Sequence, residues 1–176
     1  YYPIYNNIGT ILENKNLFEE AESWFEKCLN FDHNYIPALN NLSLVSSQLK
    51  KGERALELSS RALQIDSNNE NANVAYGLAL MTVKQSSKAI IFYEKILKRF
   101  PNNHDLLSNL AVAHRDEGNL EKSYNFNMRA YEINNQKSTT IKNLSYSKFF
   151  NPDKKMIKKI QDNYEIQKDS IDKSLI

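Results

Sequence analysis

The sequence is short of the residues that form disulfides, metal sites and flexible loops. Its 176 residues include four glycines, four prolines and one cysteine, Cys28. One cysteine forms no disulfide within a chain, which suits a reducing compartment, so we expect a cytoplasmic protein. His33, His104 and His114 do not have the spacing of metal ligands, and we expect neither a metal nor a cofactor.

The sequence also lacks a strong net charge, a long apolar run and catalytic motifs. Its 23 basic and 21 acidic residues leave a net charge of +2, too small for a nucleic-acid interface, and no apolar run is long enough for a membrane span. We therefore expect no nucleic-acid or membrane partner. With no glycine-rich phosphate loop, serine elbow or paired carboxylates, we also expect that this segment is not an enzyme.

Small residues recur at a fixed interval of 34 residues. One column holds Ala21, Ala55, Ala89 and Ser123, and a second holds Gly9, Ser43, Gly77, Ala111 and Ser145. Small side chains at a fixed period indicate pairs of antiparallel helices whose backbones approach closely, each pair stacked on the next. The period thus predicts an all-α solenoid, which is one elongated domain whatever its length.

Aligned on this period, the units resemble the tetratricopeptide repeat (TPR). The first unit has the family's pattern in Tyr5, Ile8, Gly9, Leu12, Phe18, Ala21, Phe25, Cys28 and Leu29. The fourth departs from it at Asn127, where the family prefers an aromatic residue, and at Ser123, where it prefers alanine. The resemblance implies a right-handed superhelical solenoid with repeats at 1–34, 35–69, 70–103 and 104–137, followed by a partial repeat and a capping helix in 138–176.

Local signals place the helices within these units. They predict helices over 3–14 and 18–31, a start at Pro37 and another at Gly52. The helix that begins near Ala89 is apolar nearly all round, so we expect it to be the most buried. For the capping helix we expect Asn151 as N-cap, with one apolar face formed by Met156, Ile157, Ile160, Tyr164 and Ile171.

Asparagines recur at one position within the first helix of most pairs, and they form a column at the 34-residue interval. It contains Asn7, Asn41, Asn109 and Asn143, with Ala75 in the middle position. An asparagine amide offers both a donor and an acceptor to a peptide backbone, so a row of them binds main chain without regard to sequence. In such a solenoid the first helices line the concave side, where extended peptides bind.

Three residues further along each helix lies a mainly apolar column. Its members are Thr10, Leu44, Leu78, Val112 and Tyr146. Residues three apart lie on the same helix surface, so we expect Leu44, Leu78, Val112 and Tyr146 to border the asparagines and contact a bound peptide. The alternative for this column is a place in the core between adjacent helices.

The asparagine row resembles the repeat region of the O-linked N-acetylglucosamine transferases. In those enzymes such asparagines hold the substrate backbone, and the resemblance gives this role to Asn7, Asn41, Asn109 and Asn143. Three functions stay open: a non-catalytic peptide-binding scaffold, our first interpretation; the substrate-recognition arm of a larger glycosyltransferase; and a scaffold that self-associates through its end repeats. The chain lacks an initiator Met, so we expect a piece of a longer protein, with the segments before Tyr1 and after Ile176 unknown.

Overall fold

A computed structural model describes residues 1–162, and all regular secondary structure in that range is helical. We expected one elongated domain, but the contacts divide the chain into two compact units, 1–101 and 102–176. Within residues 1–162, no helix is both long enough and apolar enough to cross a membrane.

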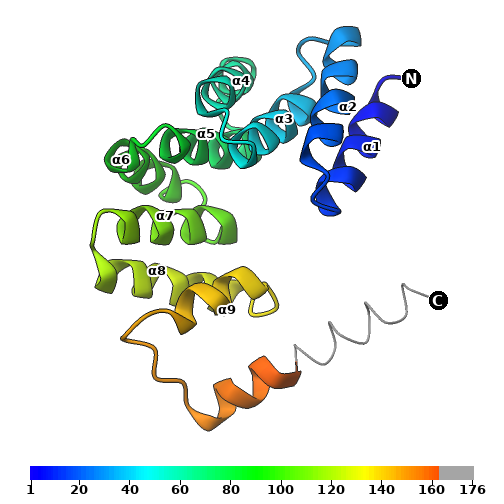
Figure 1. Cartoon of the computed structure of the whole chain (residues 1–176). Coiled ribbons are helices and arrows are strands. Elements are labelled where there is room, and N and C mark those ends of the chain that lie inside the picture. The colour runs from blue at the N-terminus through cyan, green and yellow to red at the C-terminus, as the bar shows by residue number, and fades with distance from the viewer. Residues whose placement is uncertain (163–176) are drawn as a thin grey trace, which may run out of the picture. The chain divides into compact units, whose positions relative to one another are not determined.

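The first unit consists of three helix pairs. They are α1 (Pro3–Asn14) with α2 (Phe18–Phe31), α3 (Ile36–Gln48) with α4 (Gly52–Ile65), and α5 (Glu70–Thr82) with α6 (Ser86–Leu97) (Figure 1). The first helices of successive pairs lie side by side, because α3 contacts both α1 and α5. The predicted helices 3–14 and 18–31 and the start at Gly52 are confirmed, and α3 begins one residue before Pro37.

The second unit contains one full pair and the first helix of another. These are α7 (His104–Asp116), α8 (Leu120–Ile133) and α9 (Ser138–Ser145), with α8 packed against both neighbours. Residues 154–162 form a further helix. The predicted all-α fold of stacked helix pairs is therefore confirmed, while the individual repeat boundaries stay a prediction.

The small-residue columns lie where paired helices pack most closely. Ala21, Ala55 and Ala89 are fully buried. A Cβ added to Gly9 would lie 2.5 Å from Cε1 of Phe25, so the glycine makes room for the ring. Cys28 is buried in the same core, and burial raises the pKa of its thiol, as expected of a packing residue rather than a nucleophile.

The turn inside each pair repeats one left-handed residue. Asn16, Lys50, Lys84 and Gly118 have φ angles of 59°, 62°, 62° and 79°, at the same 34-residue spacing. The amide after each of them donates to a carbonyl five residues back, for example Lys51 to Ser46 at 2.8 Å. This is the Schellman ending, in which a left-handed residue closes the helix and glycine is favoured.

Replacing Lys84 by glycine is therefore expected to stabilise the protein. A left-handed backbone costs a residue with a Cβ roughly 1–2 kcal/mol, and glycine loses about 0.5–1 kcal/mol in unfolded-state entropy. We expect Lys84→Gly to raise the free energy of unfolding by about 0.5–1 kcal/mol in a urea titration. Lys88→Gly, in the helical part of α6, is the matched control and should lower it by about 1 kcal/mol. A loss of stability in both variants would contradict this expectation.

Two expectations about single helices are wrong. Helix α6 is not the most buried, because Ile91 is 71% exposed and only Ala89, Tyr93 and Ile96 are buried, against seven residues in α5. The helix beginning at 154 is capped by Asp153 rather than Asn151: its carboxylate accepts from the Met156 amide at 2.7 Å. An acidic side chain placed three residues before a free amide is the more effective N-cap.

The predicted apolar face of this last helix is described only in part. Met156 and Ile160 are partly buried, and Ile157 is 42% exposed. Tyr164 and Ile171 lie outside the described residues. The capping role of this helix therefore stays a prediction.

Candidate functional site

All eight residues predicted to bind peptide lie at least partly at the surface. Asn7 is exposed, and Asn41, Asn109 and Asn143 are half-buried. The neighbouring column is half-buried at Leu44, Leu78 and Val112, and Tyr146 is 72% exposed. By contrast, the column two residues after the asparagines is buried at Gly9, Ser43, Gly77 and Ala111. The helices thus direct the predicted binding columns away from the core.

In the first unit, the Asn41 amide joins α3 to α1. Its Nδ2 donates to Oδ1 of Asn6 at 3.1 Å and to Oγ1 of Thr10 at 3.3 Å. The Thr10 hydroxyl in turn donates to the Asn6 carbonyl, one helical turn back, at 3.0 Å. This network holds the Asn41 amide in one orientation at the surface. Asn6 was not predicted from sequence, because its column is asparagine in only the first two repeats.

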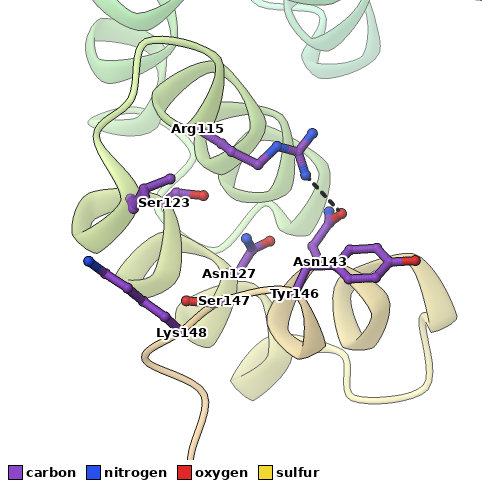
Figure 2. A pocket seen from close by; sticks show the side chains of 8 residues that line it. Arg115, Ser123, Asn127, Asn143, Tyr146, Ser147 and Lys148 are labelled. Carbon is purple, nitrogen blue, oxygen red and sulfur yellow. Dashed lines mark hydrogen bonds between the residues drawn. The ribbon is translucent and has the colours of Figure 1, made fainter.

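In the second unit, Asn143 and Tyr146 lie at a pocket that was not predicted from sequence. The pocket has a volume of ≈ 140 Å³ and lies between the end of α7, the part of α8 from Leu120 to Asn127, and the end of α9 with the segment that follows it (Figure 2). Its lining consists of Arg115, Leu120, Ser123, Asn127, Asn143, Tyr146, Ser147 and Lys148. Asn109 does not belong to this lining, so the structure brings only one asparagine of the row to the pocket.

The pocket is basic and rich in hydrogen-bonding groups. Arg115 and Lys148 supply two positive charges, and none of the described residues that line the pocket is acidic. Nη1 of Arg115 donates to Oδ1 of Asn143 at 3.5 Å, and its Nε lies 3.9 Å from the Asp116 carboxylate, outside the lining. The Arg115 side chain is 43% exposed, so its remaining N–H groups are accessible to a ligand.

Asn127 explains why a pocket is present in this repeat. It occupies the column that holds the fully buried Phe25 and Tyr93 in the first and third repeats. An amide is much smaller than these rings, and here it is 3% exposed, with an Oδ1 that has no hydrogen-bond partner within residues 1–162. In the second repeat the same column holds Ser59, whose hydroxyl is satisfied by the Ala55 carbonyl at 2.7 Å. The departure at Asn127 was thus the one sequence signal for this pocket.

Comparisons with known proteins agree with this architecture. Residues 2–35 and 70–103 match the model of the tetratricopeptide repeat family. Over 120 residues, or 68% of its length, the chain is 29% identical to the human protein O-mannosyl-transferase TMTC3, of which that match covers 13%. The chain spans 13% to 39% of the length of the curated relatives it matches.

Solved structures share the fold at low sequence identity. The thermophilic TPR protein TTC0263 of Thermus thermophilus superimposes with a TM-score of 0.74 at 11% identity, covering 93% of this chain and 99% of that one. YrrB, described as a TPR protein with an unusual peptide-binding site, has a TM-score of 0.56 at 15% identity, covering 93% and 90%. The two matched segments and this shared fold show that the chain contains tetratricopeptide repeats, as the 34-residue period indicated.

Proposed function

We propose that this chain is a non-catalytic scaffold that binds extended peptides on the surface of the first helix of each pair. The observation that carries the proposal is that the members of the two columns lie at least partly at the surface: asparagine amides on α1, α3, α7 and α9, and apolar side chains on α3, α5 and α7 and directly after α9. In the asparagine column, α5 has the buried Ala75 instead. Amides bind main chain, and apolar side chains beside them cover a peptide's own side chains.

The fold and one structural relative support this function. TPR solenoids present broad surfaces built from repeated helices, and YrrB carries a peptide-binding site on the same fold. In the network of Asn6, Thr10 and Asn41, the Nδ2 of Asn41 already donates two hydrogen bonds, so its Oδ1 is the atom that accepts a peptide N–H. An amide held in one orientation loses little side-chain entropy when a ligand binds.

The test uses a peptide selected from a random library against the chain. We expect Asn7→Ala/Asn41→Ala to weaken that peptide about tenfold, equivalent to about 1.4 kcal/mol, because each amide bond replaces a bond to water. Peptides of different sequence should lose similar affinity, since main chain is the group bound. A peptide with N-methylated backbone amides should bind weakly even to the unchanged protein.

Two controls separate binding from folding. Asn14→Ala/Asn30→Ala removes the same side chains from positions of α1 and α2 outside the two columns and should leave affinity unchanged. Because Asn41 also joins two helices, Asn7→Ala alone, at an exposed position, gives a variant whose fold is not at risk. Unchanged affinity in both Asn7 variants, with circular dichroism showing native helix content, would refute the proposal.

The match to TMTC3 favours a second candidate, the substrate-recognition arm of a larger glycosyltransferase. That relative is named as a sugar transferase, and this chain matches 13% of its length. Catalysis would then belong to sequence outside Tyr1–Ile176. Reading the gene beyond Ile176 tests this candidate, because a stop codon there would exclude a C-terminal transferase domain. Self-association, the third possibility, predicts a molecular mass that rises with concentration.

A further inference from the structure

We propose that residues 148–162, here called the basic segment, bind the surface of a membrane that contains anionic lipids. The net charge of the whole chain led us to expect no membrane partner, but this charge is unevenly distributed. The basic and acidic residues of 1–147 cancel, whereas the basic segment has five lysines against two aspartates. The segment shares no residue with the two peptide-binding columns, so the inference goes beyond the proposed function and does not depend on it.

The lysines of the basic segment are available to an anionic surface. All five are exposed, and none forms an ion pair within residues 1–162. They are Lys148, Lys154, Lys155, Lys158 and Lys159. A lysine held near an anionic bilayer strengthens binding roughly fivefold, so five of them together exceed what an isolated surface charge contributes.

The helix formed by residues 154–162 separates its charged side chains from its apolar ones (Figure 1). At 3.6 residues per turn, the four lysines of this helix occupy one side, and its three apolar residues occupy the opposite side. The apolar residues are Met156, Ile157 and Ile160. This division is typical of helices that lie in a membrane interface, where the apolar side enters the acyl boundary and the lysines reach lipid headgroups.

The apolar side chains of the basic segment are also accessible. No residue of 145–162 is buried, and Ile157 and Phe149 are 42% and 39% exposed. A nucleic acid would attract the same lysines, but its phosphates offer nothing to an exposed isoleucine. An anionic bilayer provides a partner for both kinds of side chain, and it is therefore the occupant that the segment fits best.

The experiment is sedimentation of the full chain with vesicles. One set consists of phosphatidylcholine with one third phosphatidylserine, and the control set is phosphatidylcholine alone. We expect binding to the anionic vesicles to be at least about tenfold tighter, because the neutral surface attracts no lysine. Binding should be largely lost at about 1 M salt, where the Debye length is only about 3 Å.

A charge variant tests whether this segment is responsible. Lys154→Gln/Lys155→Gln/Lys158→Gln/Lys159→Gln should weaken binding to the anionic vesicles at least about fiftyfold. The matched control makes the same charge change at four exposed lysines elsewhere, Lys88→Gln/Lys95→Gln/Lys98→Gln/Lys122→Gln, and should weaken it less than about threefold.

An apolar variant separates a membrane from other polyanions. Ile157→Asn should weaken vesicle binding about fivefold without lowering the thermal midpoint, whereas Ile91→Asn, at a site that is 71% exposed, should leave it unchanged. A residue kept only to cover the last repeat would lower the midpoint and leave vesicle binding intact.

Four results would overturn the inference. They are equal binding to the two vesicle sets, equal losses in the two charge variants, no effect of Ile157→Asn on vesicle binding, and tighter binding of a DNA oligonucleotide than of the vesicles. The Asn7→Ala/Asn41→Ala variant should keep its vesicle binding, because it leaves the basic segment unchanged. Failure of the peptide-binding proposal is thereby distinguished from failure of this one.

Discussion

Replacing Phe25 by alanine is expected to lower the free energy of unfolding by about 3–5 kcal/mol. The ring is fully buried in α2 and packs against the backbone of α1 at Gly9. Truncating a buried phenylalanine removes its transfer free energy and leaves a cavity that the surrounding helices fill only in part. This loss is a large fraction of the roughly 5–15 kcal/mol that holds an ordinary domain together.

The matched control is Phe31→Ala, at the end of the same helix. Phe31 is 69% exposed and stacks on Tyr5 with 5.5 Å between ring centroids, so its loss should cost less than about 1 kcal/mol. Urea unfolding followed by the fluorescence of Trp24, the sole tryptophan and a residue of α2, reports directly on this helix pair. Equal costs for the two substitutions would show that Phe25 does not anchor the pair.

Replacing Gly77 by alanine is expected to destabilise the third repeat by about 2–3 kcal/mol, against the usual effect of this substitution. In a helix interior, glycine to alanine ordinarily gains about 0.5–1 kcal/mol. Here the added Cβ would overlap Cζ and Cε1 of Tyr93, a fully buried ring whose hydroxyl donates to the Val74 carbonyl at 3.0 Å. Because that bond fixes the ring, the overlap is relieved only by moving α6 away from α5.

A double-mutant cycle shows whether the ring is the cause. In a Tyr93→Ser background, Gly77→Ala should become stabilising by about 0.5–1 kcal/mol. The ring that the new Cβ would overlap is then absent, and alanine keeps its higher helix propensity than glycine. The second repeat already combines two small residues in these columns, Ser43 and Ser59. The unfolding free energies of the four proteins, from urea titrations, measure the coupling. A loss of similar size in both backgrounds would place the strain elsewhere.

The 34-residue period and the local capping and turn signals were sufficient to predict where the helices lie in the sequence and which helices form pairs. The bounds of α1 and α2 and the start of α4 match the prediction, because capping residues, turn residues and apolar spacing act within a few positions of one another. The close approach at Gly9 and Gly77 also follows from sequence, since a column of small residues at a constant interval has one structural cause in a stacked array.

Tertiary packing decided which side chains are exposed and which partners they have. Apolar residues occur on almost every side of α6, yet Ile91 is exposed. The burial of a side chain depends on whether another helix packs against its face of α6, which the local sequence does not show. Asn41 and Asn6 are 35 positions apart, and their bond forms only because α1 and α3 lie side by side. A pattern of neighbouring residues does not predict a hydrogen bond between residues 35 positions apart.

The sequence by itself determined that this protein is built from helix pairs with a 34-residue period, and it marked Asn127 as a residue that departs from the pattern. Only the tertiary structure showed the consequence of that departure. Arg115, Asn127 and Lys148 come from three successive segments, and the packing of α7, α8 and α9 brings them around one space. The 34-residue period predicts only the features that recur in every repeat. The lining of this pocket depends instead on the side chains of neighbouring segments that surround Asn127, and these differ from one repeat to the next.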